Sequence, residues 1–256
     1  MSDDYLSWSP SLGKDLPKTV LKSLWLLPHD LRRSAFKKLF PKAYWRLMAL
    51  RRGIYPPYDY FFCERYSTIF VHIPKAAGQY ISINLLNGHA GHQTISDYQF
   101  MFGSEVFNRS FKFTFTRNPW DRLVSAYFYL KKGGCNEHDK EWSQKHLSNY
   151  DTFDQFVRDL PQKRFFDTWI HFIPQHKFIT DPLGRISVDY IGQVENLSQQ
   201  IQVICEKIKI NPPANPKKTN TSDHKHYSEY YTPETIQIVE GIYKRDLELF
   251  GYRFET

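Results

Sequence analysis

A lysine and a glycine follow a short apolar run in the segment VHIPKAAGQY. STIFVHI (67–73) is apolar and β-branched, which predicts a buried strand, and GQYISINLLNG (78–88) predicts a helix directly after it. The first N–H groups of such a helix carry partial positive charge and attract anions. Lys75 would add a full positive charge, and Gly78 would let a ligand approach the backbone. The alternative is an ordinary turn that exposes a lysine.

A second strand-to-helix junction carries another pair of anion-binding residues. SFKFTFT (110–116) alternates as a strand does, and NPWDRLVSAYFYLKKGG predicts a helix with Asn118 as its N-cap. Arg117 comes at the end of the strand, and Ser125 follows eight residues later, about two helical turns away. A guanidinium fork and a hydroxyl suit a phosphate. Two such sites at neighbouring strand ends predict a ligand with two separated phosphate-like groups.

The order of residues around Lys75 argues against an ATP-hydrolysing enzyme. The pattern G-x-x-x-x-G-K-[ST] is absent, because here the lysine precedes the glycine. No carboxylate suited to hold Mg²⁺ stands beside the loop. A nucleotide-dependent kinase is therefore the weaker alternative among enzymes.

Further strands and helices alternate along the chain, which predicts an α/β fold with a mostly parallel sheet. The polar run at 211–227 is longer than connecting loops usually are. The remaining predicted elements are helices over 150–160, 195–208 and 232–251, and strands over 176–180 and 185–194. The first of these helices has Asp151 or Thr152 as its N-cap, and the last has Thr232.

The positive charge is concentrated near the start of the chain. The chain has a net charge of +7, and residues 16–52 hold ten Lys or Arg against one acid. This segment predicts two or three short helices broken at Pro28 and Pro41. We interpret residues 1–60 as a basic helical extension packed on a main domain of residues 61–256. The alternative is an interfacial helix that lies on an anionic membrane. The rest of the chain is nearly neutral, so no nucleic-acid partner is predicted.

Composition excludes several classes of protein. The three cysteines are far apart and contain no CxxC, which favours neither a disulfide framework nor a metal site. No apolar stretch has the length of a membrane span, and the acidic start lacks the order of a signal peptide. A cytoplasmic protein without a metal is the expectation.

Two motifs, in the same order along the chain, and a C-terminal segment resemble those of a known enzyme family. FVHIPKAAGQYI is similar to the 5′-phosphosulfate loop of sulfotransferases that use 3′-phosphoadenosine 5′-phosphosulfate (PAPS), and FTRNPWDRLVSAY looks like their 3′-phosphate motif. The match is best with the family 2 group, which includes carbohydrate sulfotransferases. It continues through DYIGQVENL (189–197) and the segment 220–254. The resemblance implies a P-loop-like three-layer sandwich and covers about residues 66–254.

The resemblance also implies roles for individual residues. Lys75 would hold the bridging and sulfuryl oxygens of PAPS, and Arg117 with Ser125 would hold its 3′-phosphate. Ser222 and Lys225 would contact the nucleotide from the polar loop. The backbone amides that would bind the 5′-phosphate belong to Ala76, Ala77, Gly78, Gln79 and Tyr80.

A general base is needed to take the proton of the acceptor hydroxyl. Family 2 members often place a histidine between the two phosphate motifs, and His92 in NGHAGHQTISDY is our choice, with His89 as the alternate. His171, His176 and Glu195 are predicted to be structural.

The loop departs from the family where Thr or Ser hydroxyls usually stand, at Ala76, Gln79 and Tyr80. The leading interpretation is a PAPS-dependent sulfotransferase acting on a hydroxyl of a carbohydrate. A catalytically inactive relative that still binds the nucleotide is the alternative. By its likeness to bacterial relatives, we expect a cytoplasmic enzyme, and contact with the inner membrane through residues 16–52 belongs to the alternative interpretation of the extension.

Overall fold

The computed structural model describes residues 17–54, 58–217 and 225–255. Contacts divide these residues into two compact units. One unit holds the described residues up to Thr116 together with 176–217, and the other holds 117–175 with 225–255. Each unit is described by itself.

The first unit is built on a parallel sheet of three strands, β1 (Thr68–Val71), β2 (Phe111–Thr116) and β3 (Tyr190–Gln193). The order is β1-β2-β3, with Val71 paired to Thr114 and Thr116 paired to Gln193. All of β1 and the end of β2 are buried, as expected for parallel strands covered on both faces. The prediction of an α/β fold with a parallel sheet is confirmed.

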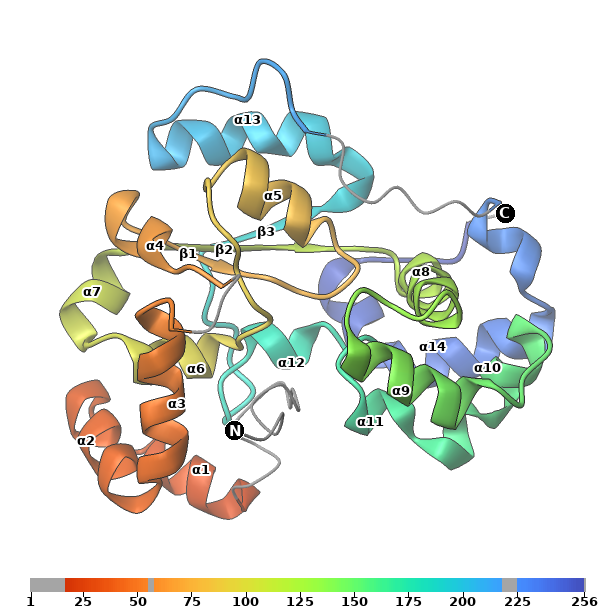
Figure 1. The fold of residues 1–256 in the computed structure, drawn as a ribbon, viewed down its shortest axis with the longest axis horizontal. Helices are drawn as coiled ribbons and strands as arrows, with labels where there is room; N and C mark the ends of the chain where they lie inside the picture. The colour runs from red at the N-terminus through yellow and green to blue at the C-terminus, as the bar shows by residue number, and fades with distance from the viewer. Residues whose placement is uncertain (1–16, 55–57, 218–224, 256) are drawn as a thin grey trace. The chain divides into compact units, whose positions relative to one another are not determined.

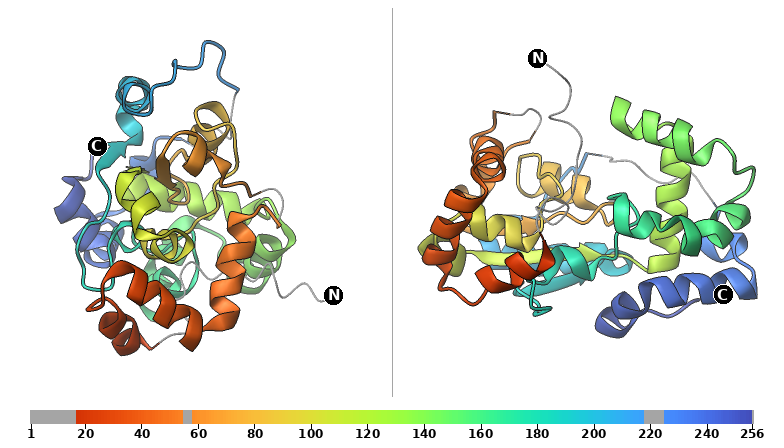
Figure 2. Two further views of the ribbon diagram at one scale, coloured as in Figure 1. Left: turned by 90° about the vertical axis from the view of Figure 1, so that its left-hand side faces the viewer. Right: turned by 90° about the horizontal axis from the view of Figure 1, so that it is seen from below.

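Helices cover both faces of this sheet (Figure 1, Figure 2). Helices α5 (Gly78–Asn84) and α13 (Leu197–Ile208) lie on one face, and α6 (Ile95–Met101) and α12 (His176–Ile179) lie on the other. The 3₁₀ turn η2 (Val194–Asn196) joins β3 to α13.

The strand predicted over residues 176–180 is wrong. The segment forms the helical turn α12, and the hydroxyl of Thr180 donates to the carbonyl of His176 at 2.9 Å. Only Thr180 forms a bridge, to Ile186. Phe178 and Ile179 are buried in this turn, and a short apolar pair can be buried equally well in a strand or in a helical turn. The pattern alone therefore could not distinguish the two.

The N-terminal helices begin and end where proline predicts. They are α1 (Lys18–Leu24), α2 (His29–Leu39) and α3 (Pro41–Arg51), followed by α4 (Phe61–Arg65). The breaks at Pro28 and Pro41 are confirmed. Helices α4 and α6, as well as α7 (Ser104–Arg109), were not predicted.

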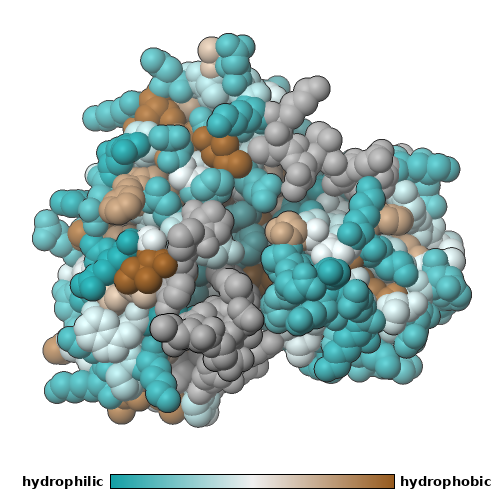
Figure 3. Space-filling view, viewed as in Figure 1, coloured by the Kyte–Doolittle hydropathy of each residue, from teal (hydrophilic) through white to brown (hydrophobic). Residues whose placement is uncertain are grey.

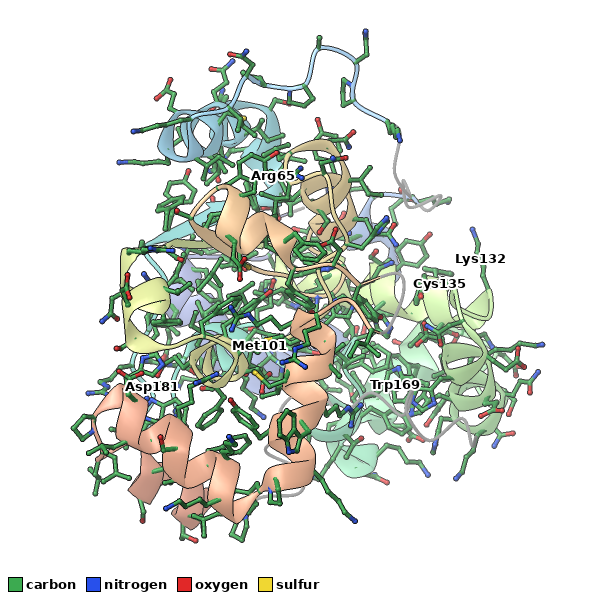
Figure 4. All side chains as sticks on the ribbon, turned by 60° about the vertical axis from the view of Figure 1, so that its left-hand side comes forward. Arg65, Met101, Lys132, Cys135, Trp169 and Asp181 are labelled. Carbon is green, nitrogen blue, oxygen red and sulfur yellow. The ribbon has the colours of Figure 1, made fainter. Side chains whose placement is uncertain are left out.

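Three basic side chains of these helices bind the C-terminal carbonyls of α6. His29 Nε2 lies 2.7 Å from the carbonyl of Gln99 and 3.1 Å from that of Phe102. Arg33 Nε donates to Phe100 O at 2.8 Å, and Arg51 Nη1 donates to Met101 O at 3.1 Å. Met101 is labelled in Figure 4. The last four carbonyls of a helix lack partners within it, and cations are favoured there. Part of the positive charge of residues 16–52 thus serves contacts within the fold.

The second unit is helical. It contains α8 (Pro119–Lys131), α9 (Glu137–Leu147), α10 (Phe153–Lys163), α11 (Phe165–Thr168) and α14 (Pro233–Phe250), with a 3₁₀ turn η3 at Tyr227–Tyr230. Its core is aromatic, with Tyr127, Phe156 and Phe172 fully buried. The predicted N-caps Asn118 and Thr232 are confirmed, and of Asp151 and Thr152 the N-cap is Thr152. Each of the three side chains accepts a hydrogen bond from the first turn of its helix.

Candidate functional site

The loop between β1 and α5 has an unusual backbone. Lys75 and Ala77 both have positive φ, 66° and 56°, whereas Ala76 between them is not left-handed and is buried. The left-handed region costs a non-glycine residue about 1–2 kcal/mol. Backbone strain of this kind concentrates at functional sites. The loop on which the sequence placed Lys75 is thus held in a conformation that neither residue prefers by itself.

Gly78 is needed for a steric reason that the sequence did not show. A Cβ built on Gly78 would lie 1.7 Å from Cδ2 and 1.9 Å from Nε2 of His72. We predicted that Gly78 lets a ligand come close to the backbone. In the structure, the group that comes close to Gly78 is the imidazole of His72. This ring packs under the first turn of α5.

His72 and His92 form a pair beneath the loop. His72 Nδ1 lies 2.8 Å from the carbonyl of Ala90, and His92 Nδ1 lies 3.1 Å from the carbonyl of His72. Because a carbonyl only accepts, both Nδ1 atoms must carry the hydrogen. In each neutral ring the lone pair that can accept a proton is then on Nε2. The ring centroids are 4.2 Å apart, so His92 packs against the ring that packs against Gly78.

Tyr60 holds the loop that carries His92. Its buried hydroxyl donates to the side-chain oxygen of Gln93 and accepts from the N–H of Gly91 at 3.1 Å. Burial raises the pKa of Tyr60 well above its ordinary value, so the hydroxyl stays protonated. His89, the alternate base, has an exposed side chain, and its carbonyl accepts from Asp59. Of the two histidines, His92 is the one packed against His72, whose ring lies against Gly78.

In the other unit, the guanidinium of Arg117 binds Asp121. Nε and Nη2 donate to the two carboxylate oxygens at 2.7 and 2.9 Å. Ser125 is buried and lies one further turn along α8, on the same face. Asp121 therefore orients the fork of Arg117 and offsets part of its charge. Sequence analysis did not identify this pair, although the spacing of four residues between Arg117 and Asp121 could have indicated it.

The side chain of a buried glutamine forms hydrogen bonds with both the N–H and the carbonyl of Arg117. The side chain of Gln175 accepts from the N–H of Arg117 at 2.9 Å and donates to its carbonyl at 2.8 Å. The N–H of Gln175 donates to Asp246 at 2.6 Å. Gln175 and Asp246 are fully buried, and no local sequence pattern pointed to them.

Four further candidate residues lie in the described part of the chain. Lys225 forms an exposed ion pair with Glu229 at 3.2 Å, and Ser222 lies outside the described residues. The sequence suggested no carboxylate for His171, but its Nε2 lies 3.2 Å from Asp139 in a buried pair. His176 lies in α12, and Glu195 lies in the 3₁₀ turn after β3.

The model of the family described as "Sulfotransferase family" matches residues 58–253. The chain belongs to the sulfotransferase family. The predicted family 2 membership is thereby confirmed. A relative from Archaeoglobus fulgidus, described as an uncharacterized protein, is 32% identical over 108 residues, which cover 41% of this chain and 73% of the relative. No solved structure matches.

For this sulfotransferase the reaction class is the transfer of a sulfuryl group. The matched residues include the Lys75 loop, His92, and the Arg117–Ser125 segment. Within the described ranges, no three His, Cys, Asp or Glu side chains are grouped so as to hold a metal ion. Among the helices in those ranges, none combines the length and hydrophobicity that crossing a bilayer requires. That Lys75 and Arg117 bind one ligand stays a prediction, because they belong to different units.

Proposed function

We propose that this sulfotransferase moves the sulfuryl group of PAPS to a hydroxyl of a carbohydrate, with His92 as the general base. Family membership and the two phosphate motifs support this proposal. The products are a sulfate ester and 3′,5′-ADP. A P-loop-like arrangement of the sheet and its helices belongs to the same proposal.

The residues around Lys75 fit the 5′ end of PAPS. Left-handed residues at 75 and 77 on either side of Ala76 are typical of turns whose successive N–H groups face one anion. Lys75 adds an ammonium to these donors. The missing hydroxyls at Ala76, Gln79 and Tyr80 leave binding to backbone donors, Lys75 and the amide of Gln79. In the other unit, Arg117 and Ser125 would bind the 3′-phosphate.

PAPS supplies an activated sulfuryl group whose leaving group is a phosphate. As the acceptor oxygen bonds to sulfur, Nε2 of His92 takes the hydroxyl proton. The bond between sulfur and the bridging oxygen breaks, and its electron pair stays on the 5′-phosphate of the nucleotide. The ammonium of Lys75 stabilises the charge that grows on that oxygen.

The hydrogen bond from His92 Nδ1 to the carbonyl of His72 is the observation that carries the choice of base, because it leaves the lone pair on Nε2. Replacement His92→Ala is expected to lower the rate of sulfuryl transfer by about 10²–10⁴-fold while 3′,5′-ADP still binds. His89→Ala is the matched control and should keep near-normal turnover. The choice of His92 is wrong if His89→Ala loses the rate and His92→Ala keeps it.

A nucleotide-binding relative without activity is the second candidate, and the missing loop hydroxyls are the observation that favours it. Calorimetry with 3′,5′-ADP, ATP and AMP tests binding. Preference for 3′,5′-ADP, lost in Arg117→Ala, is expected for either candidate, whereas preference for ATP would indicate a kinase. Sulfate transfer from PAPS to candidate glycans, measured by mass spectrometry, then separates the active enzyme from the inactive relative.

A further inference from the structure

The N-terminal helices line an open cavity of about 510 Å³. Its lining comes from α2, α3, the residue after α3, and the segment that begins α4. All of these residues belong to the first unit, and those before residue 58 lie outside the segment that matches the family. Its volume lies within the range of small-molecule binding sites. The feature is thus specific to this chain's own extension.

The cavity has an aromatic lining. Tyr44 and Tyr60 contribute buried rings, whereas the side chains of Trp45 and Phe61 are 54% and 59% exposed. Large aromatic side chains left this exposed beside a cavity can stack on a ring-shaped ligand. Sugar rings present apolar C–H faces that stack in this way.

The cavity is also strongly cationic. Arg33, Lys37, Arg51 and Arg52 line it, and Glu64 is the one acid among the described residues of its lining. Arg33 and Arg51 are fixed by carbonyls of α6, and Arg51 pairs with Glu64 at 2.8 Å.

Lys37 and Arg52 differ from those two cations. Both are exposed, and within the described ranges neither forms an ion pair. Lys37 Nζ lies 5.7 Å from the centroids of both the Tyr44 and the Trp45 rings. Two cations at the edge of an aromatic cavity are therefore placed to bind an anionic group on a ligand that stacks there.

We propose that this cavity binds an acidic saccharide, a sugar that bears a carboxylate, sulfate or phosphate. The concave shape and the buried tyrosine rings favour a small ring over a bilayer surface. On the face shown in Figure 3, exposed hydrophobic residues form separate patches. The exposed Leu26, Leu31 and Leu39 of the extension do not line the cavity. The proposal does not depend on the sulfuryl donor or on His92.

The test compares cellobiouronic acid with cellobiose, because the two disaccharides have the same rings and differ in one carboxylate. Binding to the full chain is followed by NMR through the indole N–H of Trp45, assigned among the six tryptophans with Trp45→Phe. The indole signal should shift saturably, and cellobiouronic acid should bind at least about tenfold more tightly than cellobiose, since two charge contacts contribute.

A pair of charge-matched double variants locates the site. Lys37→Gln with Arg52→Gln should weaken binding of cellobiouronic acid about tenfold. Lys38→Gln with Lys42→Gln removes two exposed cations that do not line the cavity, and should change binding less than about twofold. Unchanged thermal unfolding of both variants confirms that they fold.

Several outcomes would overturn the proposal. These are an unmoved Trp45 signal, equal affinity for the two disaccharides, or equal losses in the two double variants. Vesicles of phosphatidylglycerol and phosphatidylcholine form the other arm of the test. Binding to these vesicles without saturable binding of the acidic disaccharide would assign the basic extension to a membrane instead.

Discussion

Helices α5 and α6 have seven residues each and belong to the same unit, but their ends are built in different ways. In α6, Thr94 and Asp97 form a capping box at the N-terminus, and basic side chains from α2 and α3 bind the C-terminal carbonyls. In α5, the N-cap is the left-handed residue Ala77, which has no side chain to cap with. Side chains satisfy both ends of α6, whereas the N-cap of α5 provides no side-chain hydrogen bond, in keeping with the anion that we propose to bind there.

The largest expected effect comes from Gly78→Ala at the N-terminus of α5. Alanine usually stabilises a helix relative to glycine, but here its Cβ would overlap the ring of His72. We expect the free energy of unfolding to fall by about 1–3 kcal/mol and sulfuryl transfer to fall with it. Denaturant unfolding and a sulfate-transfer assay measure the two effects.

Two variants control this prediction. Gly241→Ala in α14, where a Cβ would meet nothing within 4 Å, should stabilise the protein by about 0.5–1 kcal/mol. His72→Ala combined with Gly78→Ala should lose less stability than the sum of the single variants, because the added Cβ no longer overlaps the imidazole once that ring is removed. Additive losses would show that His72 does not explain the glycine.

A substitution at the C-terminus of α6 should lower stability without changing catalysis. His29→Ala removes the contacts with the carbonyls of Gln99 and Phe102, and should cost about 1–2 kcal/mol of unfolding free energy without changing kcat of the folded enzyme. Lys38→Ala, an exposed position on the same helix, should stay within about 0.5 kcal/mol of the original protein. A loss of kcat in His29→Ala would remove the distinction between a structural and a functional helix end.

Tyr60 connects the two helices, because its hydroxyl holds the segment between them. Tyr60→Phe removes the hydrogen bonds to Gly91 and Gln93, and should cost about 1–2 kcal/mol at neutral pH. Turnover should also fall, since His92 lies between these two residues. Tyr66→Phe, at a half-buried tyrosine nearby, is the control and should change neither quantity appreciably.

The same variant has a predicted pH dependence. Burial raises the pKa of Tyr60 in the folded protein, whereas an unfolded tyrosine loses its proton near about pH 10. The contribution of Tyr60 to the free energy of unfolding is therefore complete below about pH 10. It is lost as the pH rises further, by up to about 1.4 kcal/mol per pH unit. Tyr60→Phe should have a shallower alkaline loss of stability than the original protein, and parallel curves would contradict the prediction.

The sequence predicted the strands that carry the motifs because β1 and β2 are apolar and lead directly into recognisable helix starts. It also predicted the caps at Asn118 and Thr232, since capping depends on residues within one turn. Local patterns could not predict α12, because its two buried apolar side chains are equally compatible with a strand and with a helical turn.

The contacts that organise the candidate site were hidden for another reason. His72 lies under Gly78, Tyr60 reaches Gly91, and Gln175 brackets Arg117 across 58 residues of sequence. Such contacts depend on the tertiary fold rather than on spacing along the chain. The ten cations of residues 16–52 show the same limit, because composition cannot distinguish an arginine that caps α6 from a lysine that borders a cavity.

The smallest expected effect tests the backbone at the N-terminus of α5 directly. Ala77→Gly relieves the cost of the left-handed conformation but gives the unfolded chain more freedom, so a net gain of up to about 1 kcal/mol is expected. Ala90→Gly, at a buried alanine that is not left-handed, should instead lose about 1 kcal/mol. If both variants lose stability equally in denaturant unfolding, the loop does not hold Ala77 in a strained conformation, and the contrast between the two helix ends rests on α6 alone.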